Sequence, residues 1–188
     1  MPSPDQQESR LDEIFQRAME LFIERGFDNT PMSLVAKETG FSKAGIYHYF
    51  DSKEHLLFLI HMDSIERNLK PLMQRASQET NPEKRLINFV REFVTVLTQD
   101  LSVQMLVHEA KRLAPEHYQQ IEQSWREVYT LVRNTLKELQ ERGGAQKGLN
   151  TTFGAFAAIG MCVWAPYWFD RSRPESLDEL VETLTGVL

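Results

Sequence analysis

Apolar residues recur at helical spacing along almost the whole of this 188-residue chain. The first such segment places four of them on one stripe, at i, i+4, i+7 and i+8: Ile14, Ala18, Leu21 and Phe22. No stretch of any length alternates apolar and polar residues, as a half-buried strand does. The pattern therefore predicts an all-α fold of about nine helices.

Glycine, proline and capping residues predict where the helices begin and end. Ser9 is expected to cap the first helix, and Gly26 to end it. Thr30 and Pro31 are expected to start the second helix, as a cap followed by proline at the first position. The predicted helices cover about residues 10–25, 31–39, 43–50, 53–78, 82–98, 101–113 and 115–141, with two more that begin near residues 150 and 174.

The stretch GFSKAGIYHYF, residues 40–50, is the most informative part of the N-terminal region. A helix that ends at Gly40, a turn for which glycine permits positive φ, and a helix capped by Ser42 form a helix-turn-helix. Such a motif presents the start of its second helix to the DNA major groove. Gly45 inside this helix costs about 1 kcal/mol relative to alanine. Close approach to DNA would explain it; the alternative is that it only packs against a neighbouring helix.

Several side chains of this region are suited to contact DNA. Ala44 and Gly45 are short enough for the helix backbone to come near base edges. Polar donors and positive charge for phosphate oxygens are expected from Ser42, Lys43, Tyr47, His48 and Lys53.

The block GFDNTPMSLVAKETGFSKAGIYHYFDSKEHLL, residues 26–57, resembles the tetracycline-repressor (TetR) family of bacterial transcription regulators. The resemblance implies a homodimer, DNA contacts from the third helix and a ligand pocket in the C-terminal domain. By position it adds Thr30 to the expected phosphate contacts and assigns Ala44 and Gly45 to the bases. Many members have glycine at the position of Ala44 and threonine or alanine at that of Gly45, which leaves the operator sequence open.

The charge balance opposes strong non-specific binding to DNA. The chain has a net charge of −6, and up to Glu54 it holds six basic and ten acidic residues. Because non-specific affinity rests on basic charge, the contacts must come from local placement, polar donors and helix N-termini. The same balance leaves open a helical interaction protein that does not bind DNA.

Two later segments carry a second resemblance. They are HEAKRLAPEHYQQIEQSWREVY, from His108, and TTFGAFAAIGMCVWAPYWFDRSRPESLDELVETL, from Thr151. Together they are similar to the C-terminal domain of TetR regulators of fatty-acid and sterol catabolism, whose effectors are acyl-CoA thioesters. The residues expected to line a tunnel for the acyl chain and to meet the phosphates are Met105, His108, Arg112, Phe153, Phe156, Met161, Trp164, Trp168 and Arg171.

These ligand-binding predictions have plainer alternatives. Aromatic and methionine stripes usually belong to a core. Glu109 and Arg112, at i and i+3, commonly form an ion pair on a helix face. An unrelated apolar molecule is the alternative to a thioester effector.

Residues 148–169 contain no charged residue and are long enough to span a bilayer. Polar Asn150 at the start, two glycines within and Pro166 near the end favour a buried helix instead. Together with a last helix from Pro174, this helix is expected to form a four-helix bundle with a second subunit. Such a homodimer places two recognition helices one DNA turn apart, about 34–36 Å.

These predictions define a helix-turn-helix DNA-binding domain at residues 1–54 and a ligand-binding and dimerisation domain at residues 55–188. Nucleophile-elbow, phosphate-loop, paired-carboxylate and metal-ligand signatures are absent from the sequence, so we expect no enzyme activity, cofactor or metal. The polar stretch MPSPDQQES and the single Cys162 favour a cytoplasmic protein without a membrane anchor. The predicted function is a repressor that leaves a pseudo-palindromic, double-stranded DNA operator when a small hydrophobic effector, such as an acyl-CoA, binds.

Overall fold

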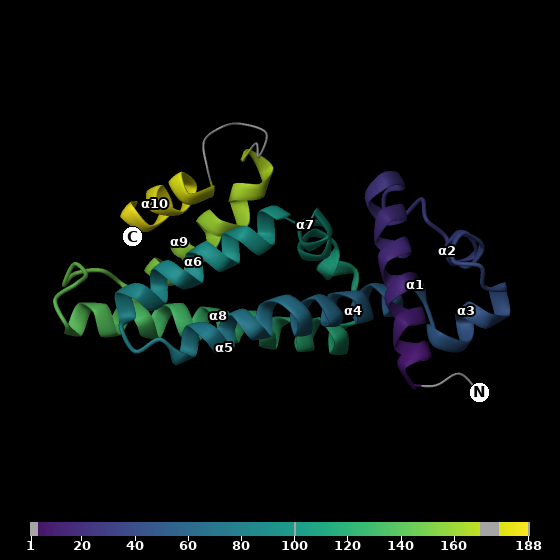
Figure 1. Cartoon of the computed structure of the whole chain (residues 1–188), viewed down its shortest axis with the longest axis horizontal. Coiled ribbons are helices and arrows are strands. Elements are labelled where there is room, and N and C mark those ends of the chain that lie inside the picture. The colour runs from purple at the N-terminus through teal and green to yellow at the C-terminus, as the bar shows by residue number, and fades with distance from the viewer. Residues whose placement is uncertain (1–3, 100, 170–176, 188) are drawn as a thin grey trace. The chain divides into compact units, whose positions relative to one another are not determined.

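The computed structural model describes residues 4–99, 101–169 and 177–187, and all regular structure in these ranges is helical (Figure 1). A π-helical turn, Ile65–Leu69, joins α4 to α5 in one continuous helix. With that helix counted once, the described ranges hold nine α-helices, and the predicted all-α fold is confirmed. The helices are α1 Pro4–Arg25, α2 Met32–Glu38, α3 Lys43–Tyr49, α4 Lys53–Ser64, α5 Lys70–Gln78, α6 Pro82–Gln99, α7 Leu101–Glu109, α8 Pro115–Glu141, α9 Thr151–Trp164 and α10 Leu177–Val187.

The chain divides into two compact units. The first comprises Met1–Asp63 together with Met105–Tyr118, and the second comprises Ser64–Gln104 together with Gln119–Leu188. The end of α7 and the start of α8 thus belong with the N-terminal helices. No pattern in the sequence indicates this return of the chain, and the predicted domains 1–54 and 55–188 do not include it.

The core of the first unit is built from the apolar stripes of its helices. The α1 stripe predicted from the sequence is buried throughout, with each of its four residues at most 2% exposed. Gly26 and Gly40 end their helices in the left-handed region, with φ of +82° and +74°. The rest of the unit adds further buried residues to the core: Val35, Ala36, Ile46, Phe50, Leu56, Leu57, Leu106 and Leu113.

Two capping predictions are wrong. Helix α1 begins at Pro4, so Ser9 lies inside the helix rather than at its cap. Pro31 occupies the cap position of α2, and no side chain caps that helix. The Thr30 side chain is instead fully buried, and its hydroxyl donates to the carbonyl oxygens of Leu21 at 3.2 Å and Gly26 at 3.0 Å.

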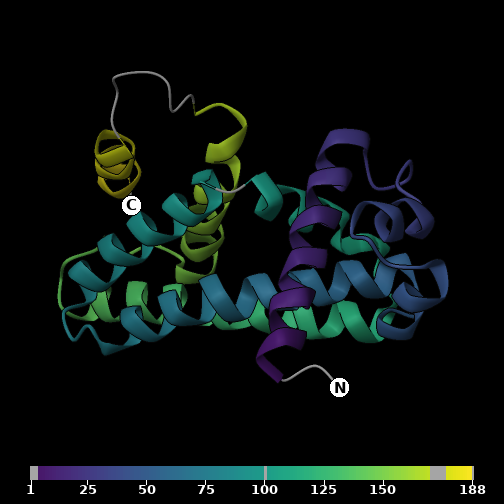
Figure 2. The same cartoon turned by 45° about the vertical axis from the view of Figure 1, so that its right-hand side comes forward.

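In the second unit, α6 packs against α5, α9 and α10 (Figures 1 and 2). Helix α9 begins near residue 150 as predicted, and Asn150 caps it: its side-chain oxygen accepts from the backbone N–H groups of Thr152 and Phe153 at 3.0 and 3.3 Å. Gly154 allows close packing on α8, since a Cβ added there would lie 3.1 Å from Cδ1 of Leu136. The predicted start of the last helix, at Pro174, lies outside the described residues.

The uncharged stretch at residues 148–169 contains a 14-residue helix followed by a short 3-10 turn, Ala165–Tyr167. Among the helices of the described ranges, none is long and apolar enough to cross a membrane.

Candidate nucleic-acid interface and ligand-binding region

Helix α3 has one face in the core and the other in solvent. Ile46 is fully buried, and Phe50 just after the helix is 1% exposed. The Ser42 side chain caps the helix and accepts from the backbone N–H of Gly45 at 3.0 Å, as predicted. The exposed face consists of Lys43, Ala44, Tyr47 and His48.

The turn before α3 holds it against α2. The backbone N–H of Phe41 donates to the carbonyl oxygen of Ala36 at 2.8 Å, directly across the positive-φ residue Gly40. Ala36 is 2% exposed, so its small side chain lets the two helices pack closely. Local backbone geometry therefore presents the exposed α3 face as a rigid unit.

Gly45 has an intramolecular reason that the sequence did not reveal. A Cβ added there would lie 3.0 Å from Oγ of Ser42 and 3.6 Å from Cδ1 of Phe41. A methyl group would crowd the oxygen that caps the helix. The predicted contact of Gly45 with base edges stays a prediction, and the tight space beside the capping oxygen is a second reason for glycine at this position.

Lys53 is partly engaged inside the protein. Its ammonium donates to the carbonyl oxygen of Phe27 at 2.6 Å and lies 4.3 Å from the centre of that ring. An ammonium has three donors, so a further bond to a phosphate is chemically open. Lys53 nevertheless ties the start of α4 to the turn between α1 and α2.

Thr30 does not occupy the position predicted for a phosphate contact. Its hydroxyl proton is directed to main-chain oxygens beneath the surface, and the residue is 0% exposed. The sequence pattern of threonine before proline indicated a surface cap, whereas the side chain turns inward to satisfy the end of α1. Its role in this structure is to hold the α1–α2 turn.

An ion pair offsets the acidic charge near the helix-turn-helix. The Arg17 guanidinium donates to carboxylate oxygens of Glu20 and Glu38, both at 2.8 Å. The hydrogen bond from Arg17 is the main cause that holds the pKa of Glu38 below its ordinary value. Arg17 thus neutralises the charge of Glu38 at the end of α2. The net charge of the region does not reveal this local pairing.

The aromatic residues expected to line a tunnel lie on the surface of α9 and the turn after it. Phe153 is 71% exposed and Trp164 63%, and Phe156 and Trp168 are also exposed. Small residues, Gly154, Ala155, Ala158 and Cys162, form the buried face of α9. Because the small residues face the interior, Phe153, Phe156, Trp164 and Trp168 lie outside the core of the subunit, and their predicted contact with an acyl chain stays a prediction.

The remaining predicted ligand residues are dispersed. Met161 is half-buried on α9, whereas Met105 is half-buried and His108 exposed on α7, in the other unit. Arg112 is held by Asp28 and Glu109. The ion pair of Glu109 and Arg112, the plainer alternative, is therefore present, and contact of Arg112 with a ligand stays a prediction. Arg171 lies outside the described residues.

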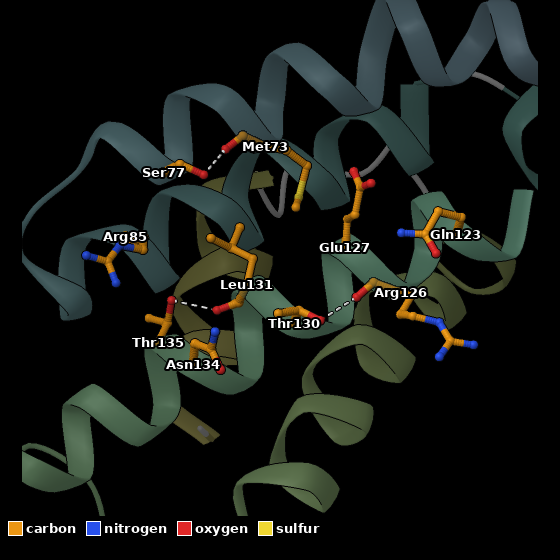
Figure 3. A pocket seen from close by; sticks show the side chains of 10 residues that line it. All are labelled: Met73, Ser77, Arg85, Gln123, Arg126, Glu127, Thr130, Leu131, Asn134 and Thr135. Carbon is orange, nitrogen blue, oxygen red and sulfur yellow. Dashed lines mark hydrogen bonds between the residues drawn. The ribbon is translucent and has the colours of Figure 1, made fainter. Parts of the chain in front are cut away.

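A groove that the sequence did not predict lies in the second unit, between α5, the start of α6 and α8 (Figure 3). Its volume is about 560 Å³. Met73 and Glu127 point into this space in Figure 3. In the sequence, the only signal for this groove was the row of polar residues on one face of α8. The lining consists of Met73, Ser77, Arg85, Gln123, Arg126, Glu127, Thr130, Leu131, Asn134 and Thr135.

His61 is a second feature that the sequence analysis missed. It is 3% exposed, and its Nδ1 has no hydrogen-bond partner among the described residues. Burial lowers the pKa of His61 to about 4. Its spacing from buried Leu57 and Ile65, at i−4 and i+4, places it on the apolar stripe of the helix and was the signal that could have found it.

A short helix held across a positive-φ turn, with its apolar side in the core and a polar side exposed, defines a helix-turn-helix protein. Residues 14–60 match the family model described as bacterial regulatory proteins, tetR family. Residues 79–188 match the tetracyclin repressor-like C-terminal domain. The chain therefore belongs to the tetR family of bacterial regulators, and the resemblance seen in the sequence is confirmed.

Curated relatives carry regulator names. The HTH-type transcriptional repressor KstR2 of Mycolicibacterium smegmatis (strain ATCC 700084 / mc(2)155) is 29% identical over 60% of this chain and 55% of its own length. The uncharacterized HTH-type regulator YfiR of Bacillus subtilis (strain 168) is 27% identical over 65% of this chain and 55% of its own. These matches span about half the length of the two relatives.

Solved structures share the fold over nearly the full chain. AibR in complex with isovaleryl coenzyme A and operator DNA has a TM-score of 0.86 at 25% identity, covering 95% of this chain and 97% of AibR. FadR from Bacillus subtilis in complex with stearoyl-CoA has a TM-score of 0.75 at 18% identity, covering 93% and 95%. The second likeness shows the fold alone.

Proposed function

We propose that this protein is a DNA-binding transcriptional repressor whose affinity for its operator falls when a small acyl-CoA binds. The observation that carries the DNA-binding part is the exposed face of α3, on which short Ala44 is flanked by Lys43, Tyr47 and His48 while Ile46 anchors the helix. Short residues allow close approach of the backbone to base edges, and the flanking donors reach phosphates.

Within this proposal the side chains have separate roles. Lys43, Tyr47 and His48 contact phosphates, and the Ser42 hydroxyl donates to a phosphate while its oxygen keeps the helix cap. Ala44 and Gly45 face the bases. Lys53 shares its ammonium between the Phe27 carbonyl oxygen and DNA. Thr30 supports the turn and makes no contact through its side chain.

We further propose that the exposed aromatic face of α9 is the surface on which two subunits meet. It combines Phe153, Phe156 and Trp164 with the small exposed residues Ala157 and Gly160. An apolar face of this kind needs cover in water, and small residues allow two helices to approach closely. A second copy supplies the same face in return, as two-fold symmetry requires.

The effector proposal rests on likeness to a protein crystallised with its ligand. The chain is 25% identical to AibR, which was solved with isovaleryl coenzyme A and operator DNA. The groove of the second unit has the volume of a small-ligand site. Its lining includes apolar Met73 and Leu131 and, at its edge, the exposed cation Arg126, which pairs with Glu122. Apolar side chains and a cation suit a ligand with a short acyl part and a charged part.

The test selects genomic DNA fragments on the purified protein and then measures operator affinity with isovaleryl-CoA, stearoyl-CoA and free CoA. We expect one specific fragment, and weaker binding with an acyl-CoA but not with free CoA. Arg126→Ala should lower acyl-CoA affinity without changing operator affinity. Failure to select any fragment would favour the rival reading, a helical interaction protein, which the acidic N-terminal region supports. If operator binding responds only to an unrelated apolar molecule, the proposal of a repressor stands and the proposal of an acyl-CoA effector fails.

A further inference from the structure

The segment Met105–Tyr118 belongs to the C-terminal domain by sequence and to the helix-turn-helix unit by structure. It falls inside the C-terminal family match, residues 79–188, yet it lies in the compact unit of the helix-turn-helix. The segment contains the end of α7, and its contacts with the turn from α1 to α2 lie within one compact unit.

Arg112 makes the most specific of these contacts. Its two terminal nitrogens donate to the two carboxylate oxygens of Asp28, each at 2.8 Å, and its Nε donates to Glu109. Two parallel hydrogen bonds of this kind fix direction as well as distance. The guanidinium also lies 5.4 Å from the centre of the Phe27 ring. One side chain thus joins the segment to two successive residues of the turn.

The turn itself is tied to its surroundings on several sides. Phe27 is 4% exposed and packs on Phe22 with ring centres 5.0 Å apart, and Lys53 donates to its carbonyl oxygen. The turn leads directly into α2, and α2 holds α3 through the Gly40 turn. Only Asn29, Thr30 and Pro31 separate Asp28 from α2, so the connection from Asp28 to the exposed face of α3 is short.

The other end of the segment is anchored. The ring of His117 stacks on Phe58 with centres 4.0 Å apart and planes at 7°. Arg112 thus lies between this anchor and α7. The side chain of Arg112 is 36% exposed and that of Asp28 69%, and exposed ion pairs stabilise a fold little. Such a contact is easily broken by a shift of its helix, which suits a link that changes between two states.

We propose that Arg112 is a positioning residue that holds the α1–α2 turn through Asp28 and transmits a change in α7 to the helix-turn-helix. This inference rests on the proposed function, and it deepens it by naming the contact through which a ligand alters operator affinity. The groove proposed for the ligand is lined by α8, which begins at Pro115, three residues after Arg112. Met105 and His108, predicted from the sequence as ligand contacts, lie on α7, less than two helical turns before Arg112.

The experiment compares four proteins with the wild type. Asp28→Asn removes the carboxylate charge and leaves the Arg112–Glu109 pair. Arg112→Lys keeps the charge but loses the two-fold hydrogen bond. The double variant tests whether the two effects share one contact. Arg75→Gln is the matched control, because it removes an exposed ion pair with Glu92 in the other unit.

Three quantities are measured: operator affinity, the factor by which isovaleryl-CoA or stearoyl-CoA changes it, and amide exchange over residues 27–41. We expect Asp28→Asn and Arg112→Lys each to weaken operator binding about 5-fold and to reduce the acyl-CoA factor by a similar amount. The double variant should do no more than either single one. Amide exchange should rise in these variants and not in Arg75→Gln.

The outcomes separate this proposal from the function on which it rests. If the variants bind the operator and respond to acyl-CoA as Arg75→Gln does, Arg112 forms only a surface ion pair and the proposal is overturned. If acyl-CoA does not change operator binding by the wild type, the effector proposal fails. The operator affinities of the variants and the wild type, measured without ligand, then decide whether Arg112 positions the turn. If the wild type binds no DNA, the proposed function fails. Amide exchange then decides: faster exchange in both variants supports the link, and unchanged exchange refutes it.

Discussion

The ammonium of Lys53 lies 4.3 Å from the centre of the Phe27 ring and donates to the carbonyl oxygen of the same residue at 2.6 Å. A single cation thus satisfies a main-chain oxygen at the turn and faces an aromatic ring. The contact joins α4 to the turn that precedes α2, so it belongs to the fold as well as to the predicted DNA interface.

Lys53→Ala should therefore lower stability as well as DNA affinity. Loss of a charge-assisted hydrogen bond and of a cation–π contact is expected to reduce the free energy of unfolding by about 1–2 kcal/mol. Lys43→Ala is the matched control, because Lys43 is exposed on α3 and should weaken operator binding alone. Denaturant titration of both variants checks the prediction. Equal stability of the two would mean that the Lys53 contact contributes nothing in solution.

The cap at Ser42 should decide whether a substitution at Gly45 stabilises or destabilises the protein. Gly45→Ala places a Cβ 3.0 Å from the capping oxygen, so its expected effect in the wild type is neutral or destabilising. In a Ser42→Ala background the obstruction is gone, and the same change should stabilise by up to about 1 kcal/mol through helix propensity. Thermal unfolding of the four proteins measures the difference. Stabilisation by the same amount in both backgrounds would show that the cap does not constrain residue 45.

Two glutamate substitutions should separate assembly from folding. Ala157 is exposed on α9, so Ala157→Glu should split the dimer and leave the subunit folded. Leu184 is 7% exposed within its own subunit, so Leu184→Glu should unfold it, because a buried charge without a partner is strongly destabilising. Sedimentation velocity and circular dichroism measure the two effects. A dimer that survives Ala157→Glu would place the interface elsewhere.

His61 should make the fold sensitive to acid. Burial lowers its pKa from the ordinary 6.5 to about 4, so the unfolded chain binds a proton that the folded chain excludes. The free energy of unfolding is therefore unaffected by this group above about pH 6.5 and falls as the pH decreases toward 4, by up to about 3 kcal/mol.

The measurement is urea unfolding at about pH 7 and about pH 5 of three proteins. His61→Leu should lose this part of the pH dependence, and it also removes a buried nitrogen without a partner. His108→Gln is the control, because the His108 side chain is 65% exposed, and it should keep the wild-type dependence. An undiminished pH dependence in His61→Leu would mean that other groups cause the acid sensitivity.

Local chemistry made the helices predictable. The α1 stripe, the positive-φ glycines 26 and 40 and the caps at Ser42 and Asn150 each depend on residues close in sequence. The predicted role of Thr30 as a cap was wrong because its hydroxyl can either cap α2 or donate to carbonyl oxygens at the end of α1. Packing decides between the two, and packing is not visible in the local sequence. The helix-turn-helix was therefore predictable in outline, while one side chain was not.

The ligand-binding region was less predictable, because it depends on which face of a helix is buried. Helix α9 is apolar all round, so its sequence does not show whether Phe153 or Gly154 faces the interior. Burial of the small residues follows from close packing against Leu136, a residue that is distant in sequence. The pairing of Arg112 with Asp28 depends in the same way on a return of the chain that no local pattern records.

The return of Met105–Tyr118 to the N-terminal unit also limits how this protein recombines. Leu106, Ala110 and Leu113 are buried there, so a fragment that ends at Asp63 lacks part of its own core. A single crossover between two related genes would join Asp28 from one parent to Arg112 from the other. To exchange DNA specificity between relatives, Met1–Asp63 and Met105–Tyr118 must therefore be transferred together. Transfer of the first stretch alone would combine contact residues from two different parents.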